Sequence, residues 1–403
     1  MTNDIEYKNI IFRICRELNT FEERRLGLLS GLSGIALFQF YMGTHSESSE
    51  MSEYGYKTID KIYQIVANEL TDNYSFCSGL SGIAWMIDFL DRKNLINKNS
   101  KQSLKELEGL FYSISVRDNN LLNYDFLHGH LGIFIFFACQ KKKSKKVQNA
   151  LNLFIDKIHE DADKIEPKVL KWKYYEDNNT RIKWNYNISI SHGNTAIVAL
   201  LTKLKMEGFV NPKIEIIVSE AIEYILKQQI DKFKYGSYFS YLALESEKKI
   251  RPSRLAWCYG DLGIAVVLWN AGNTFENNQW KQKAIEILLF AAKYRKNLNK
   301  NGVMDAGLCH GTVGIGHIFY RMWWNTGMDD FKKAADYWFE ETIKMSKFPD
   351  GLIGFHVYYR TFDGKGTWMN EYNLLEGITG IGLALQSYLY NKEPAWDECL
   401  LLS

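Results

Sequence analysis

The sequence has no excess of charge of either sign. Its 403 residues include 49 lysines and arginines and 47 aspartates and glutamates, which gives a formal net charge of +2. Proteins that bind nucleic acid usually carry a clustered surplus of basic residues to neutralise phosphates. The charge balance therefore gives no sign of a nucleic-acid partner.

Long apolar runs are also missing. No stretch reaches the roughly 18–20 apolar residues that a membrane-spanning helix needs. The first residues, Met1 to Lys8, are polar and acidic and lack the apolar core of a secretory signal peptide. We therefore expect no membrane span and a cytoplasmic location.

Cysteine is sparse and scattered. The chain has six, which are Cys15, Cys77, Cys139, Cys258, Cys309 and Cys399. In a cytosolic chain, cysteines so far apart are more typical of free thiols or metal ligands than of disulfides.

Glycine, in contrast, recurs in a regular pattern. Pairs with the spacing Gly-x-x-Gly are Gly31/Gly34, Gly79/Gly82, Gly129/Gly132, Gly260/Gly263, Gly311/Gly314 and Gly377/Gly380. Gly193 begins a seventh copy in which Ala196 takes the second place. The copies lie 48 to 67 residues apart. A period of this length indicates a repeat architecture.

The repeats predict an all-α fold. Each contains two helical patterns, so we expect seven helical hairpins in one large domain, residues 1–403, although length alone would suggest two or three domains. Glycine allows close approach at the start of one helix in each hairpin. A closed ring would bring all seven turns to one end, which we call the mouth. An open solenoid is the alternative, and the convergence of candidate ligands from different repeats favours the ring.

Three stretches interrupt the helical pattern. In residues 165–190, aromatic and apolar residues alternate with polar ones on both sides of Glu176-Asp-Asn-Asn179, which predicts strand, turn and strand. Two further aromatic stretches span residues 235–244 and 351–368. We expect these insertions to lie near the mouth. Two roles are possible for these insertions: a purely structural one and recognition of a substrate peptide.

Equivalent positions in the repeats indicate which residues line the mouth. Immediately before the first glycine of each repeat stand Ser30, Ser78, His128, His192, Tyr259, His310 and Glu376. One position earlier stand Leu29, Cys77, Leu127, Ser191, Cys258, Cys309 and Leu375. The first two repeats offer only serines next to the glycine, whereas repeats three to seven offer titratable groups.

Cys258, Cys309 and His310 form a candidate metal site. Two thiolates and one imidazole suit zinc, with the fourth position left open as in catalytic zinc sites. Coordination to a metal deprotonates a thiol that is mostly protonated at neutral pH, so such a site can activate the thiol of a substrate. Cys77 shares the register but lies three repeats from Cys258, and we do not expect it to be a fourth ligand.

Three motifs carry a family resemblance, which spans nearly the whole chain. Trp257-Cys258-Tyr259-Gly260, Cys309-His310-Gly311 and Ser191-His192-Gly193 resemble the lanthionine synthetase C-like family, in particular the stand-alone cyclases of class I lanthipeptide pathways. The resemblance implies an α/α toroid of seven inner and seven outer helices with small β-hairpin-like insertions. It also implies one zinc ion per chain, held by Cys258, Cys309 and His310.

The same resemblance implies an activity. Members of this family add cysteine thiols of a precursor peptide to dehydroalanine or dehydrobutyrine, which forms lanthionine or methyllanthionine thioether rings. The implied partners are a dehydrated precursor with leader and core, a dehydratase and an exporter. The implied location is cytoplasmic, with peripheral association at the inner face of the membrane in a biosynthetic complex as a further option.

By the same resemblance, four residues match catalytic positions. His192 matches an acid/base histidine, and Asp125 matches a catalytic aspartate. Arg254, four residues before Cys258, and Tyr259 match an arginine and a tyrosine beside the metal. Departures from the family pattern are His128-Gly-His130, Ala196 and the direct succession of Gly260 and Asp261; they affect expectations about ring geometry and substrate choice.

Other functions remain as alternatives. A non-catalytic family member would bind zinc together with glutathione or a peptide and show no turnover. Another zinc thiol-alkylating enzyme, such as a protein prenyltransferase subunit, should show an Asp-x-Cys ligand pair, and none stands near either cysteine. An α/α-barrel glycosidase would need two facing carboxylates, whereas this register supplies mainly thiols and imidazoles.

Overall fold

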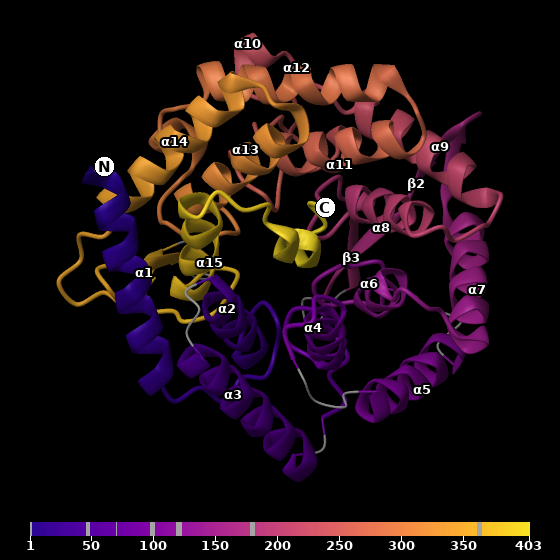
Figure 1. Ribbon diagram of the computed structural model, residues 1–403. Helices are drawn as coiled ribbons and strands as arrows, with labels where there is room; N and C mark the ends of the chain where they lie inside the picture. Colours follow the sequence, from indigo (N-terminus) through magenta and orange to yellow (C-terminus); the bar gives the residue numbers. More distant parts are fainter. Residues whose placement is uncertain are drawn as a thin grey trace.

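The computed structural model describes residues 2–45, 49–69, 71–96, 101–117, 123–177, 182–360 and 365–403. Within these ranges, seven inner and seven outer helices form two concentric rings (Figure 1). The inner helices are α2 (Leu32–His45), α4 (Leu80–Arg92), α6 (Leu131–Cys139), α8 (Asn194–Met206), α11 (Asp261–Thr274), α13 (Thr312–Thr326) and α15 (Ile378–Leu389). The outer helices are α1 (Thr2–Thr20), α3 (Ser49–Asn68), α5 (Lys101–Arg117), α7 (Lys145–Asp161), α9 (Lys213–Lys227), α12 (Asn278–Tyr294) and α14 (Asp329–Lys344).

The ring closes. Each inner helix packs against the outer helix that follows it in the chain, and the last inner helix, α15, packs against the first outer helix, α1. Inner neighbours are also in contact around the full circle, including α15 with α2. This arrangement confirms the predicted toroid and excludes the open solenoid.

Composition explains which helices lie inside. All nine residues of α6 are buried, because this helix is apolar on every side and is covered on every side. The outer helix α7 buries only Val147, Ala150, Leu151, Phe154, Ile155 and Ile158. Their spacing of three and four residues forms a single apolar stripe that faces the inner ring.

A belt of backbone hydrogen bonds joins the seven turns. The residue two positions before each first glycine donates its N–H to the carbonyl of its counterpart in the next repeat. The bonds are Leu29 to Cys77, Cys77 to Leu127, Ser191 to Cys258, Cys258 to Cys309, Cys309 to Leu375 and Leu375 to Leu29, with distances from 2.8 to 3.5 Å. Among the described residues, only the junction between Leu127 and Ser191 lacks this bond. The belt places equivalent residues side by side, as the register predicts.

The C-terminal segment lies inside the ring (Figure 1). Its short 3₁₀ helix η3 (Ala395–Leu400) is buried apart from its first residue. Asp397 pairs with Arg321 of α13 at 2.9 Å, and Glu398 pairs with Arg92 of α4 at 2.6 Å. Acidic side chains of the last residues therefore tie inner helices from distant repeats together.

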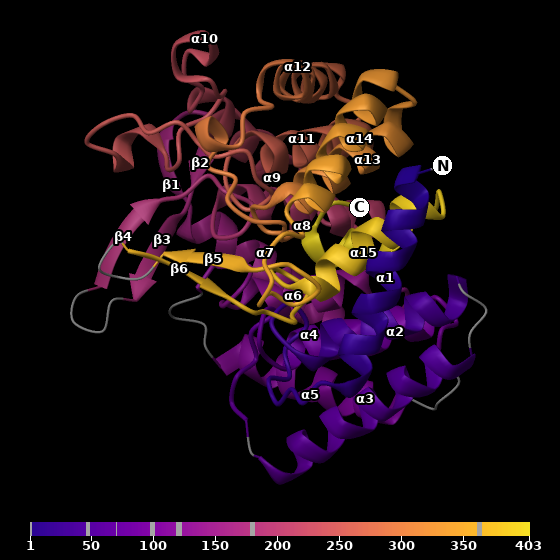
Figure 2. The same ribbon diagram turned by 90° about the vertical axis from the view of Figure 1, so that its left-hand side faces the viewer.

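The insertions contain three small hairpins. Their strands are β1 (Asp163–Glu166) with β2 (Val169–Lys171), β3 (Lys173–Asp177) with β4 (Ile182–Tyr186), and β5 (Val357–Arg360) with β6 (Gly366–Met369), all antiparallel. Figure 2 shows β3–β4 and β5–β6 extending from the same side of the toroid. The remaining short helices are α10 (Lys232–Tyr235), η1 (Leu244–Ser246) and η2 (Asn299–Asn301).

The first insertion differs in detail from the prediction. The alternation from Leu170 to Tyr174 suggested one strand, but the chain divides at Trp172 between β2 and β3. The reason is that Trp172 is buried: its indole donates to the Ile158 carbonyl at 2.7 Å, and its backbone N–H donates to Asn194 at 2.9 Å. The expected turn at Asn178 and Asn179 lies outside the described residues.

No helix in the described part of the chain combines the length and the apolar character needed to cross a membrane.

Candidate active site

Cys258, Cys309 and His310 meet at the mouth. Their ligand atoms, two sulfurs and one imidazole nitrogen, all lie within 4.8 Å of one another. Both cysteines are buried and free of disulfides, and His310 is half-buried. This set of soft and borderline donors fits zinc, and three protein ligands leave a position for a substrate.

The turns before α11 and α13 bring these ligands together. Trp257 and Cys258 both donate backbone N–H groups to the Cys309 carbonyl, at 3.1 and 3.4 Å. Gly260 has a φ of +90°, and a Cβ at this position would lie 2.1 Å from Ser253 Oγ. Only glycine fits this combination of left-handed backbone and close approach. The glycine of this repeat is therefore needed to hold Cys258 in place.

Electrostatics favour a thiolate at this site. Hydrogen bonding with the Cys309 thiol lowers the pKa of Cys258 well below its usual range, and the same interaction raises the pKa of Cys309. Burial opposes the charged form of His310, but the Cys258 sulfur and the Asp305 carboxylate together raise its pKa. Arg254 is mostly buried, which disfavours its charge, yet the neighbouring Cys258 raises its pKa. The Arg254 guanidinium therefore adds a positive charge that favours the Cys258 thiolate.

Asp125 and His192 form a pair across repeats three and four. Asp125 Oδ2 lies 2.6 Å from His192 Nδ1, and Asp125 is buried. Its other oxygen, Oδ1, accepts the backbone N–H of His128 at 2.8 Å. A buried carboxylate held in this way fixes the orientation of the imidazole.

Tyr259 lies next to this pair. Its ring is stacked on Tyr241 with centroids 4.3 Å apart, and its hydroxyl accepts a hydrogen bond from Asn187 at 3.3 Å. The ring centroid lies 5.9 Å from that of His192. Burial raises the pKa of Tyr259, so its hydroxyl stays protonated at neutral pH. The structure therefore brings each of the four sequence-predicted catalytic residues, Asp125, His192, Arg254 and Tyr259, close to another site residue.

Each insertion contributes an aromatic residue that the sequence analysis did not assign to the site. Tyr174 of β3 lies 5.7 Å from His192 between ring centroids. Tyr241 stacks on Tyr259, and the Tyr359 hydroxyl of β5 donates a short hydrogen bond to Glu376. The alternating and aromatic patterns located these segments, but no motif spacing pointed to these three side chains.

Asp305 is a further residue that the sequence analysis missed. Its Oδ2 lies 3.6 Å from His310 Nε2 and also accepts the Tyr358 N–H at 3.1 Å. Four residues before the belt position in other repeats stand Asn73, Asn123, Asn187 and Arg254. The side chains of the three asparagines and of Asp305 each accept the N–H two residues later, at 2.9 to 3.0 Å. This recurring position is the signal that could have revealed Asp305.

Two departures from the family pattern, at His130 and Asp261, have structural explanations. His130 is buried and bonded at both ring nitrogens, to Tyr74 at 3.3 Å and to the Asn123 N–H at 3.1 Å. Asp261 is buried at the start of α11 and pairs with Arg295 at 2.8 Å. It also accepts the backbone N–H groups of Tyr238 and Phe239 at 3.1 Å, which anchors the second insertion.

Cys77, from the register, and His317, a histidine close to the sixth glycine motif, lie outside the metal group. Cys77 does not belong to the cluster of ligand atoms found among the described residues, and burial raises its pKa to about 12. His317 lies inside α13 and pairs with Asp397 of the C-terminal segment at 2.9 Å. Proximity to a glycine motif in the sequence therefore does not by itself place a histidine at the mouth.

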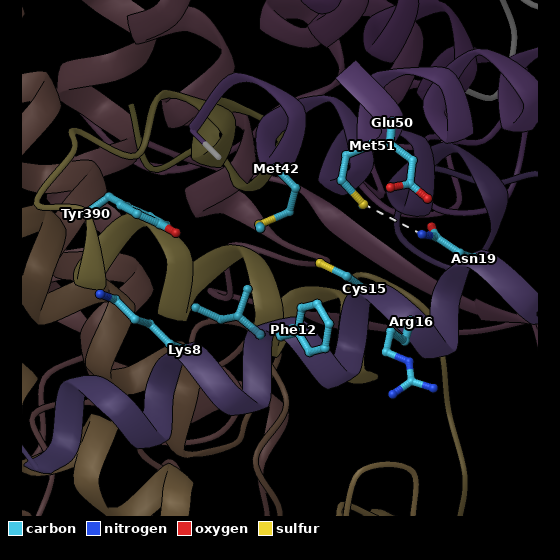
Figure 3. A pocket seen from close by; sticks show the side chains of 10 residues that line it. Lys8, Phe12, Cys15, Arg16, Asn19, Met42, Glu50, Met51 and Tyr390 are labelled. Carbon is cyan, nitrogen blue, oxygen red and sulfur yellow. Dashed lines mark hydrogen bonds between the residues drawn. The ribbon is translucent and has the colours of Figure 1, made fainter. Parts of the chain in front are cut away.

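A separate pocket of about 410 Å³ lies on the outer side of the toroid between α1, α2 and α3 (Figure 3). Its lining includes Phe12, Cys15, Met42 and Met51, with Lys8 and Arg16 also present. It shares no residue with the site at the mouth.

The toroid with its glycine turns is also found in known proteins, as comparisons of the sequence and the structure show. The family model described as lanthionine synthetase C-like protein matches residues 22–401, so the chain belongs to this family. A relative is the nisin biosynthesis protein NisC of Lactococcus lactis subsp. lactis, which is 24% identical over 412 residues, covering 97% of this chain and 92% of the relative. The solved structure of nisin cyclase has a TM-score of 0.75 and 20% sequence identity, covering 98% of this chain and 97% of that one. This likeness shows the shared toroidal fold.

Proposed function

We propose that this protein is a zinc-dependent lanthipeptide cyclase. It adds cysteine thiols of a dehydrated precursor peptide to dehydroalanine or dehydrobutyrine, which forms lanthionine or methyllanthionine. The observation that carries the proposal is the convergence at one mouth of the Cys258, Cys309 and His310 donors with the Asp125–His192 pair. Family membership and the names of the two relatives, nisin biosynthesis protein and nisin cyclase, support it.

In this proposal Cys258, Cys309 and His310 hold zinc, which when bound favours the thiolate form of the substrate cysteine. The reaction is an addition without a leaving group. The thiol loses its proton to water, its sulfur bonds to the β-carbon of the dehydro residue, and the electron pair of the double bond moves toward the carbonyl oxygen. The enolate then gains a proton at the α-carbon, so the product has the same mass as the substrate.

The chain's own side chains handle this proton and charge. His192 delivers the proton to the α-carbon, because its Nδ1 is held by Asp125 while Nε2 has no hydrogen-bond partner among the described residues. Asp125 keeps the imidazole oriented. Arg254 and the protonated hydroxyl of Tyr259 stabilise the negative charge on the enolate oxygen. The projecting hairpins β3–β4 and β5–β6 contact the peptide outside the reacting residues.

The Asp125–His192 pair favours catalysis over the non-catalytic alternative. A zinc protein that only binds glutathione or a peptide needs metal ligands but no buried carboxylate aligned with an imidazole. We further propose that the dehydrated precursor, with leader and core, is supplied by a dehydratase and that the product passes to an exporter. In this scheme the protein works in the cytoplasm.

The direct test uses a precursor peptide encoded near this gene, dehydrated enzymatically and then incubated with the purified protein. After the reaction, a thiol-blocking reagent is added and the peptide is analysed by mass spectrometry. We expect each ring formed to protect one cysteine from the reagent, with no other change in mass. Unchanged reagent uptake with wild-type protein that contains zinc would contradict the proposal.

A further inference from the structure

His128 is a second imidazole beside the Asp125–His192 pair. It stands immediately before Gly129, the position that His192 and His310 occupy in their own repeats. Its ring is stacked on that of His192, with centroids 6.0 Å apart and an angle of 22° between planes. Its backbone N–H donates to Asp125 Oδ1, so one carboxylate is bonded to both histidine residues.

The two imidazoles differ in their surroundings. His192 is half-buried, and its ring neighbours are His128, Tyr174 and Tyr259, while Asp125 holds its Nδ1. His128 is exposed, and its ring nitrogens have no hydrogen-bond partner among the described residues. The neighbouring rings therefore limit the contact of His192 with solvent, whereas the side chain of His128 is exposed to solvent.

We propose that His128 is a proton-relay residue that exchanges protons between His192 and solvent. The inference rests on the proposed function, because it gives His128 a role in the proton transfer of the addition. The thiol proton released in the reaction and the proton delivered to the α-carbon need not pass through the same nitrogen. With His128 present, protonated His192 gives its proton to the α-carbon and regains one from protonated His128, which regains one from water.

Charge coupling supports the pairing. Partial desolvation of the ring lowers the pKa of His128, the Asp125 carboxylate opposes that shift, and the neighbouring His192 lowers the pKa further. Two imidazoles stacked 6.0 Å apart between ring centroids resist carrying two positive charges at once. Such a pair therefore favours holding a single proton. His130, only two residues away, cannot play this part because it is buried and bonded at both nitrogens.

The kinetic test compares His128→Ala with Ser78→Ala, the residue at the same register position in repeat two. Cyclisation of the dehydrated precursor is measured in a dilute buffer without imidazole. We expect His128→Ala to lower kcat by about 10-fold to 100-fold, a loss at or below the range of a general acid or base, with KM within about 2-fold. Adding imidazole should restore kcat in proportion to its concentration. Ser78→Ala should react at the wild-type rate, and His128→Gln should repeat the loss with a side chain of similar size.

A second measurement does not depend on turnover. In NMR titrations of the zinc-loaded protein with ¹⁵N-labelled histidine, His192→Gln should raise the pKa of His128, since it removes a neighbouring cation. A wild-type kcat in His128→Ala, a raised KM without rescue by imidazole, or an unchanged His128 pKa in His192→Gln would overturn the relay. Absence of cyclisation by the wild-type protein would instead count against the proposed function, and the NMR titration would still decide whether the two histidines are coupled.

Discussion

Asp125 Oδ2 lies 2.6 Å from His192 Nδ1, at the one junction where, among the described residues, the turn belt lacks its backbone bond. Elsewhere in the described belt, main-chain groups hold neighbouring turns together. Here a carboxylate and an imidazole span the gap. Side chains and not backbone groups therefore connect the two turns at this junction, and His192, the proposed proton donor, lies there.

His192→Asn should retain zinc and slow cyclisation by a factor of about 10²–10⁴, because the variant removes a general acid but no metal ligand. Single-turnover cyclisation and elemental analysis of the same sample measure both properties. Asp125→Asn is the companion variant and should also be slow, since the imidazole loses the carboxylate that holds its Nδ1. A fully active His192→Asn protein would remove His192 from the mechanism.

The purified protein should contain one zinc ion per chain, and Cys309→Ala should lose both the zinc and cyclisation. The variant should nevertheless remain helical and unfold cooperatively, because the two rings bury a large core without the metal. Elemental analysis, circular dichroism and a thermal melt test this combination. An unfolded Cys309→Ala protein would show that the metal is needed for folding and would contradict a purely catalytic zinc.

Gly260→Ala should destabilise the fold by about 2–4 kcal/mol, because it combines a left-handed backbone with a clash against Ser253. Gly208→Ala is the matched control. Its φ of +74° is similar, but no heavy atom lies within 4 Å of the added Cβ, so its cost should be about 1 kcal/mol. Urea unfolding of the two variants gives the comparison. Equal losses would mean that backbone strain alone accounts for Gly260.

The Asp397–Arg321 pair should make stability depend on acid pH. Burial opposes the charged form of Asp397, but Arg321 and His317 together lower its pKa. A carboxylate with a lowered folded-state pKa stabilises the fold above its unfolded pKa of about 3.9 and loses that contribution as the pH falls through the folded-state value. Urea midpoints should therefore fall steeply below about pH 4.

The matched control for this pH dependence is the double variant Asp397→Leu/Arg321→Met. Replacing a buried ion pair by apolar residues of similar volume often has little net cost, whereas removing one partner costs about 3–5 kcal/mol. The double variant should therefore show a flatter acid limb than wild type, and Asp397→Leu alone should be strongly destabilised. The same acid slope in the double variant would assign the effect to other carboxylates.

Trp184→Ala should weaken binding of the precursor peptide and leave zinc content and folding unchanged. Trp184 lies on β4 and is 50% exposed, and its hairpin partner β3 carries Tyr174 to His192. Trp324→Ala is the control, because this tryptophan is 39% exposed near the far end of α13. Fluorescence anisotropy of a labelled precursor measures both affinities. If both variants bind the precursor with the same affinity, the insertion has only a structural role.

The sequence alone determined the repeat, the ring of hairpins and the three candidate zinc ligands. The repeat can be recognised from its Gly-x-x-Gly spacing, because close packing at each turn excludes a side chain and the same constraint acts in seven repeats. Register then placed Cys258 and Cys309 together, since equivalent residues of a closed ring must be neighbours. The backbone hydrogen bonds of the belt join such equivalent residues directly.

Only the tertiary structure decided how side chains outside the motifs complete the site. The folded insertions bring Tyr174, Tyr241 and Tyr359 into contact with residues of the mouth, and these tyrosines stand at no fixed spacing from a glycine motif. The position of the C-terminal segment inside the ring could not be predicted from the sequence either. Its acidic residues act through Arg92 and Arg321, more than 70 positions away in the chain, and such long-range ion pairs depend on where the ring places each helix end.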